Sequence, residues 1–272
     1  MARSHRRRSS AARGNGAGRG RPLDLAEAAA RVAERFAGTA VRSLRDGCGH
    51  CFTADERLLL ATPDAPLERG LAMRAAWKVP HFDDMDGLMR RVLPALATAI
   101  VDGEYDMGRA LRGLAWARFR EWPPSMVAPV LDLLDTWFLT TLRGPGDGAH
   151  VVLEACAAAD NGAGRWLAMW EREKTPVADA HLAQAAWWWA GDIAPPTIDW
   201  LLSPDDVIAE LRAWLAGYAA ERMAAYGAPP ELIRRLRGLV PAPGAESGGE
   251  AWDGVLLPRP SEWAGVRPGP CT

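Results

Sequence analysis

Residues 83–102, "DDMDGLMRRVLPALATAIVD", decide the fold class of this chain. Their apolar side chains recur at offsets of 0, 3, 4, 7, 8, 11 and 15 residues, which places them on one stripe of an α-helix. The members of that stripe are Met85, Leu88, Met89, Val92, Leu93, Leu96 and Ile100. Pro94 lies inside the stretch, so we expect it to kink the helix or divide it. The acidic run at residues 83–86 is typical of a first helical turn, although its carboxylates could also bind a metal ion.

The rest of the chain repeats this helical pattern almost throughout. Thr53 and Glu56 form a capping box, and "SPDD" at residues 203–206 is typical of a helix start. Further helices are predicted at residues 23–37, 53–60, 106–119, 124–142, 147–159, 163–173, 178–191, 203–226 and 229–239. Only residues 39–44, "TAVRSL", resemble a strand, and one strand does not make a sheet. We therefore predict an all-α fold of about nine or ten helices, arranged as an irregular multi-helix bundle or as a stacked, HEAT-like helical array.

Composition divides the chain into one helical domain and two tails. Residues 1–22 carry seven Arg and no acidic residue among Gly and Ser, so we expect a disordered basic tail. Residues 23–239 form the predicted single all-helical domain, and residues 240–272 are predicted to be an irregular tail rich in Pro and Gly. Outside the basic tail the chain has 25 basic and 34 acidic side chains, which gives a net charge of −9. Binding of nucleic acid is therefore not expected except through residues 1–22.

The sequence favours a cytoplasmic location. No apolar run approaches the roughly 18–20 residues that span a membrane. The basic N-terminus is not followed by the apolar segment of a secretory signal. Four Cys in 272 residues do not suggest a disulfide framework. We predict a cytoplasmic protein with reduced thiols and no membrane contact.

Residues 46–56, "DGCGHCFTADE", contain a CGHC motif with three interpretations. The motif matches the active site of thiol–disulfide enzymes, whose reactive Cys lies at a helix N-terminus, but such folds place it after a buried strand. A Cys-x-x-Cys pair is also half of a zinc site, and Cys48, Cys51 and His81 could bind structural zinc with one further ligand. The third interpretation is a tight turn with two half-buried thiols, which Gly47 and Gly49 would favour.

Three short motifs together resemble an uncharacterised bacterial family of helical proteins with an N-terminal cysteine pair. The cysteine pair precedes a short helix, a second helix carries "RRVLPAL" at residues 90–96, and "REWPP" at residues 120–124 precedes a long helix. The similarity covers residues 41–142. It implies a helical fold and nothing about chemistry. Members of the family often carry a tighter cysteine cluster than this chain does.

Thirteen Trp residues are a high number for 272 residues. Trp187, Trp188 and Trp189 are consecutive, so at 100° per residue they fan over about 200° of a helix. Either that helix is surrounded on all sides, or one indole faces outward. Indoles can fill gaps between helices with bonded N–H groups, anchor a protein interface, or line a ligand pocket.

The sequence contains no Walker loop, no GxSxG motif and no HExxH motif. His181 lies near the start of a predicted helix, so we expect it to be a cap or a surface residue. We predict a non-enzymatic helical scaffold that binds a protein partner through Trp187, Trp188 and Trp189. The alternative is a thiol-redox or metal-dependent protein that acts through Cys48 and Cys51, with zinc as the implied cofactor.

Overall fold

The computed structural model describes residues 24–44, 49–105, 107–192, 204–240 and 258–263. Within these ranges the secondary structure is helical and no strand is found, which confirms the predicted all-α fold. The α-helices are α1 (Leu25–Phe36), α2 (Ala54–Ala61), α3 (Arg69–Trp77), α4 (Met85–Val101), α5 (Gly108–Trp116), α6 (Pro124–Arg143), α7 (Ala149–Asp160), α8 (Gly164–Arg172), α9 (Pro176–Asp192), α10 (Pro204–Trp214), α11 (Ala220–Tyr226) and α12 (Pro230–Gly238). Shorter helical turns lie between them at η1 (Val79–His81), η2 (Phe119–Glu121) and η3 (Leu215–Ala219), and η4 (Pro260–Glu262) follows α12. No helix of the described ranges combines the length and the apolar character needed to cross a bilayer.

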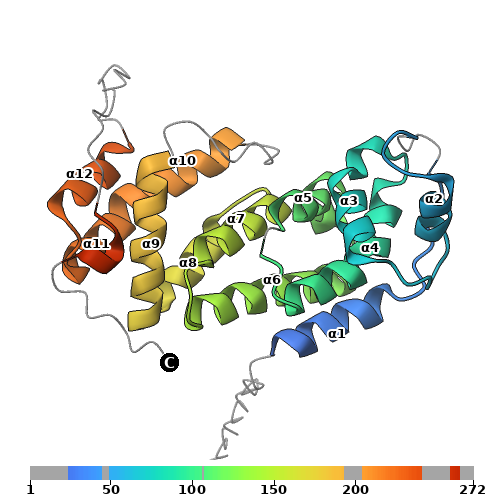
Figure 1. Ribbon diagram of the computed structural model, residues 1–272, viewed down its shortest axis with the longest axis horizontal. Coiled ribbons are helices and arrows are strands. Elements are labelled where there is room, and N and C mark those ends of the chain that lie inside the picture. Colours follow the sequence, from blue (N-terminus) through green and yellow to red (C-terminus); the bar gives the residue numbers. More distant parts are fainter. Residues whose placement is uncertain (1–23, 45–48, 106, 193–203, 241–257, 264–272) are drawn as a thin grey trace, which may run out of the picture.

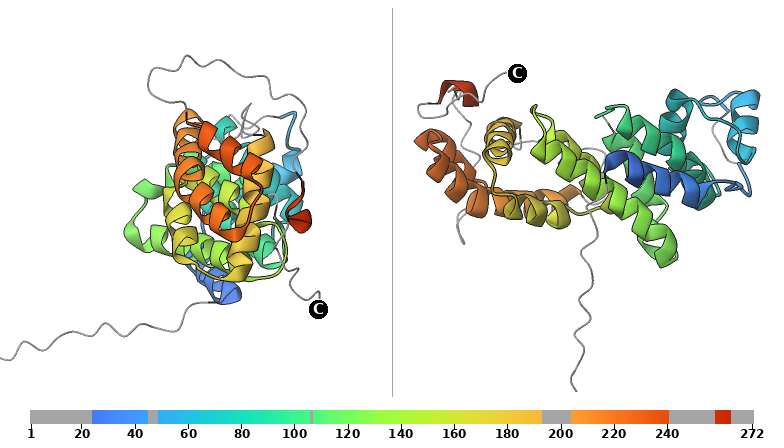
Figure 2. Two further views of the ribbon diagram at one scale, coloured as in Figure 1. Left: turned by 90° about the vertical axis from the view of Figure 1, so that its left-hand side faces the viewer. Right: turned by 90° about the horizontal axis from the view of Figure 1, so that it is seen from below.

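Two helical layers run along the long axis of the molecule (Figure 1). One layer consists of α3, α5 and α7, in which each helix packs on the next. The other layer consists of α4, α1 and α6, and it packs on the first through α3 and α4 and through α6 and α7. Figure 2 shows the elongated outline that results, with a small cross-section when the molecule is viewed end-on. The arrangement is a stacked helical array, one of the two predicted architectures.

Helix α1 fills the position between α4 and α6, although α1 ends at Phe36 and α6 begins only at Pro124. Its N-cap Asp24 and Glu27 form a capping box, with contacts of 2.7 and 3.2 Å. Its buried face includes Val32 and Phe36, and the Phe36 ring lies 5.8 Å from that of Trp122. Without α1 the apolar faces of α4 and α6 would be exposed along one side of the array.

Helix α4 is the most deeply buried helix of the N-terminal half. Six members of the predicted stripe expose at most 1% of their surface, and Met85 is half-buried. The helix continues through Pro94 without a break, so of the two expected effects the division is wrong, and the kink stays a prediction. Asp84 caps the helix by accepting from the N–H of Gly87 at 2.9 Å, and it also accepts from the backbone N–H of Arg42 at 2.7 Å. The acidic run at residues 83–86 therefore begins a helix, and the strand-like residues 39–44 form an irregular segment held by that cap.

The observed helices differ from the predicted ones at two places. Helix α3 is not among the predicted helices, because its buried face is one Leu and three Ala residues, which give little apolar periodicity. The predicted helix at residues 203–226 is helical without a gap from Pro204 to Tyr226, but it contains a π-helical turn, η3, in which Gly217 lies. Glycine is a weak helix former and permits such local rewinding.

Helices α8 and α9 close one end of the two layers, and α10, α11 and α12 pack against them. The turn η4 also contacts α9, and the nearby Trp263 exposes only 4% of its surface. The buried apolar residues of the described ranges form one continuous cluster from Ala28 to Trp263. The predicted tail at residues 1–22 and most of the predicted tail at residues 240–272 lie outside the described residues.

Candidate functional site

The turn that carries the CGHC motif leads directly into helix α2. Cys48 lies outside the described residues, and Cys51 is half-buried two positions before Thr53. The Thr53 hydroxyl accepts from the N–H of Glu56 at 3.2 Å, and the Glu56 carboxylate accepts from the N–H of Thr53 at 2.8 Å. This is the capping box that the sequence predicts, and it places Cys51 close to a helix N-terminus.

His81 lies at the exposed end of η1. The rings of Phe52 and Phe82 pack with centroids 5.3 Å apart, so the segment of Cys51 lies beside the segment of His81. Where the structure describes the chain, it gathers no three His, Cys, Asp or Glu side chains into a group that could hold a metal ion. Cys48 lies outside the described residues, so the zinc site of Cys48, Cys51 and His81 stays a prediction.

The three consecutive tryptophans of α9 have three different environments. Trp189 is 2% exposed and donates its indole N–H to a carboxylate oxygen of Glu154 on α7 at 2.8 Å. Trp187 is half-buried, and Trp188 is 45% exposed. The centroids of the Trp187 and Trp188 rings are 6.4 Å apart. Of the two alternatives, a helix surrounded on all sides or one indole facing outward, the structure has the second, and the outward indole is Trp188.

Two buried histidines lie near these tryptophans. The His150 ring lies 5.7 Å from that of Trp188 and bonds through Nδ1 to the carbonyl of Asp147 at 3.0 Å. Burial lowers the pKa of His150, with the neighbouring His181 acting in the same direction and Asp147 opposing both. His181 is only 2% exposed and bonds through Nε2 to the carbonyl of Gly144 at 3.0 Å. The expectation that His181 is a cap or surface residue is wrong, because its ring turns inward beneath the α6–α7 turn.

Most of the other tryptophans fill the space between helices. Trp170 is fully buried, and its ring centroid lies 5.8 to 6.3 Å from those of Phe138, Trp189 and Trp214. The indole N–H groups of this cluster are bonded within the protein: Trp170 to the carbonyl of Ala178, Trp189 to Glu154, and Trp214 to Glu171. The cluster joins α6, α8, α9 and α10 and is a structural core.

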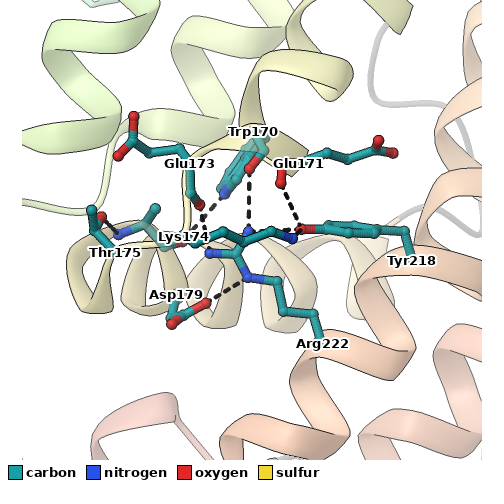
Figure 3. A network of polar contacts seen from close by, with 9 residues as sticks. Trp170, Glu171, Glu173, Lys174, Thr175, Asp179, Tyr218 and Arg222 are labelled. Atoms are coloured by element: carbon teal, nitrogen blue, oxygen red, sulfur yellow. Dashed lines mark hydrogen bonds and ion pairs between the residues drawn. The ribbon is translucent and has the colours of Figure 1, made fainter.

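A polar network surrounds the C-terminal end of α8 (Figure 3). Arg222 of α11 donates to Asp179 at 2.5 Å and to the carbonyls of Trp170 and Glu173 at 3.2 and 2.8 Å. The Tyr218 hydroxyl donates to the next carbonyl of the same helix end, that of Glu171. These contacts satisfy carbonyl groups that the end of a helix leaves unpaired. The network therefore fixes α11 against α8 and α9.

A small open cavity of about 240 Å³ adjoins this network. Its lining consists of Lys174, Asp179, Arg222, Ala225 and Tyr226. The guanidinium of Arg222 already donates to several protein oxygens, and Asp179 is its ion-pair partner. Burial together with Asp179 raises the pKa of the Tyr226 phenol. Arg222 and Asp179, two of the charged groups that line this cavity, thus bind each other and hold α11 against α9.

A second group of exposed aromatic residues was not predicted from the sequence. Trp77 at the end of α3 and Trp116 at the end of α5 are 43% and 36% exposed. Lys78 Nζ lies 4.2 Å from the centroid of the Trp77 ring, and the guanidinium carbon of Arg109 lies 5.5 Å from it. The guanidinium carbon of Arg112 lies 5.5 Å from the Trp116 ring. We call these five residues the cation–indole patch; its only sequence signal is the i,i+4 spacing of Arg112 and Trp116.

Comparison with known proteins gives no relative on which to base a function. No model of a known family matches the chain, no curated protein matches it, and no solved structure matches it. The resemblance of residues 41–142 to an uncharacterised bacterial family therefore stays a prediction.

Proposed function

We propose that this protein is a non-enzymatic helical scaffold of the cytoplasm that binds a protein partner through the C-terminal half of α9. We call the contact region the α9 surface; it consists of Trp188, the half-buried Trp187 and the edge of His150. The observation that carries the proposal is the exposure of Trp188, which is 45% although the next indole along the helix is buried.

An indole in this position is suited to a protein interface. Trp is enriched among the few residues that supply most of the binding free energy of protein complexes, because it buries a large apolar area and retains an N–H donor. Trp188 has apolar neighbours on its own helix and on α7, since the rings of Trp187 and His150 lie 6.4 and 5.7 Å away. A partner that covers Trp188 would therefore cover a continuous patch.

The α9 surface is held in place by the core beneath it. Trp189 packs on Trp170 with ring centroids 6.3 Å apart and bonds to Glu154, which fixes the rotation of α9 about its axis. His150 is anchored by its bond to the carbonyl of Asp147. A side chain that is already positioned loses little conformational entropy on binding.

The experiment uses the full-length protein as bait in extracts of its source cells, with Trp188→Ser and Val177→Ser as variants. Val177 is 40% exposed on the first turn of α9 and controls for the loss of an exposed apolar side chain on the same helix. We expect the proteins captured by the wild type to be depleted about tenfold with Trp188→Ser and retained with Val177→Ser. Equal capture by all three baits, at matched thermal stability, would show that the α9 surface is not the interface.

We also propose a second candidate function, a thiol-redox or metal-dependent activity at Cys48 and Cys51. The contact between Phe52 and Phe82 supports it, because this contact brings the CGHC turn beside the segment of His81. The test is elemental analysis of purified protein with thiol counting, comparing the wild type with Cys48→Ser and with Cys156→Ser as the control. One zinc ion per chain that is lost only in Cys48→Ser supports a structural metal site. The absence of metal, together with thiols that react slowly, would remove this candidate.

A further inference from the structure

Positive charge is concentrated at the cation–indole patch, on a chain whose overall charge is −2. Helices α3 and α5 contain four Arg and no acidic residue. Lys78, which follows α3 directly, is one of only two lysines in the chain. Of the four arginines, Arg74 is neutralised by an ion pair with Glu56. Arg109 and Arg112, together with Lys78, are the cations of the patch.

Two of these cations have no ion-pair partner among the described residues. Neither Lys78 nor Arg109 has a carboxylate within ion-pair distance in the part of the chain that the structure describes. Asp102 and Glu104 precede α5 and make no ion pair with either cation. Arg109 also lies in the first turn of α5, where the helix dipole disfavours a cation and favours an anion. Lys78 and Arg109 therefore present positive charge to solvent.

The indoles hold these cations in position. Lys78 and Arg109 both lie against the ring of Trp77, and Arg112 lies against the ring of Trp116. Arg109, Arg112 and Trp116 have i, i+3 and i+7 spacing, so they lie on one face of α5. That face extends over roughly 11 Å at 1.5 Å per residue. The patch is thus a short row of cations whose side chains are already ordered by contact with aromatic rings.

We propose that the cation–indole patch binds an acidic peptide segment of a partner protein. Carboxylates spaced along an extended peptide would accept charge-assisted hydrogen bonds from Lys78 and Arg109, and the bidentate geometry of a guanidinium suits a carboxylate well. The exposed edges of Trp77 and Trp116 would contact the apolar parts of the same segment. Because the cations are ordered before binding, less conformational entropy is lost than for isolated surface lysines and arginines.

An acidic peptide fits this surface better than a nucleic acid does. Base stacking requires an open aromatic face, and two cations already lie against the ring of Trp77. The three cations Lys78, Arg109 and Arg112 would contact only two or three phosphates of a strand.

The experiment measures fluorescence anisotropy of a fluorescein-labelled peptide of alternating Glu and Ser, titrated with full-length protein at low ionic strength. A peptide of alternating Gln and Ser tests the need for charge, and labelled oligothymidine tests the nucleic-acid alternative. The variants are Lys78→Gln/Arg109→Gln and a matched control, Arg172→Gln/Arg237→Gln. The control removes two exposed arginines from α8 and α12 and therefore lowers the overall charge by the same amount.

We expect the Glu peptide to bind the wild type and the control, and we expect its Kd to rise about tenfold with Lys78→Gln/Arg109→Gln. Salt at about 0.5 M should weaken the binding, since Arg109 is exposed and Lys78 is only half-buried. Equal Kd values for the two double variants, or binding of oligothymidine without binding of the Glu peptide, would overturn the proposal. The proposal is independent of the α9 surface: Trp188→Ser should bind the Glu peptide as the wild type does.

Discussion

The adjacent tryptophans of α9 offer a sharp test of the fold. Trp189 and Trp188 are the same residue type on the same helix, but they are 2% and 45% exposed. Replacing Trp189 by Ala removes a buried ring, which costs about 3–5 kcal/mol. It also removes the bond to the Glu154 carboxylate, which adds about 1 kcal/mol or more. We expect the free energy of unfolding to fall by about 4–6 kcal/mol.

Replacing Trp188 by Ala should have a much smaller effect. About half of this indole is already in water, so roughly 100 Å² of buried area is lost and no enclosed cavity forms. This area corresponds to about 1–2 kcal/mol once the compactness of the unfolded state is considered. The two variants should therefore differ by about 2–5 kcal/mol.

The assay is urea unfolding followed by circular dichroism at the helical band. With a denaturant dependence of about 2–3 kcal/mol per M for a domain of this size, the midpoints of the two variants should be separated by about 1 M. Trp189→Phe, which keeps one ring but loses the bond to Glu154 and part of the indole volume, should lie between them and remains measurable if Trp189→Ala does not fold. Equal destabilisation by Trp188→Ala and Trp189→Ala would show that the rotation of α9 described above is wrong, and the α9 surface would then lose its basis.

Three further predictions concern packing, titration and thiol reactivity. A Cβ at Gly113 would lie 2.6 Å from the carbonyl oxygen of Ala76, so Gly113→Ala should force α3 and α5 apart. We expect this variant to lose about 1–3 kcal/mol of stability in thermal unfolding. Gly70→Ala, with open space around it, should be neutral or stabilising by up to about 1 kcal/mol. Burial lowers the pKa of His150 below its ordinary value of 6.5, so the unfolded chain binds a proton first as the pH falls. The stability that this group contributes is therefore present above pH 6.5 and is lost below it. The free energy of unfolding should fall by at most about 1.4 kcal/mol per pH unit. In unfolding midpoints measured between pH 7 and pH 5, His150→Gln should therefore lose less stability than the wild type, and an unchanged pH dependence would contradict this assignment. Burial also raises the pKa of the Cys156 thiol, so a thiol reagent should modify this residue only after unfolding, and peptide mapping that finds it modified in native protein would show that the site opens.

The positions of individual helices were predictable because their signals are local. The stripe on α4 and the capping box at Thr53 depend only on residues within a few turns, and both appear in the structure as predicted. The fan of three indoles on α9 is likewise a consequence of helical geometry, and it left two possibilities, a helix surrounded on all sides or one indole facing outward. Helix α3 was not predicted, because a buried face made mostly of Ala gives no apolar period to recognise.

Contacts between distant segments could not be predicted in this way. The burial of His181 depends on the turn between α6 and α7, which supplies the Gly144 carbonyl that its ring bonds. The cation–indole patch exists because α3 and α5 lie side by side, which brings Arg109 to the ring of Trp77 across 32 positions of sequence. No periodicity in the sequence records either contact.

The sequence by itself therefore determined that the chain is all-α, where most helices begin and end, and that the three tryptophans of α9 point in different directions. Only the tertiary structure decided that α1 lies between α4 and α6, that Trp188 is the exposed indole, and that Lys78 and Arg109 meet at one ring. The physical reason is the range of the interactions. Helix formation depends on hydrogen bonds and capping within a few residues, whereas the packing of helices depends on the complementary shapes of surfaces that the chain brings together only when it folds.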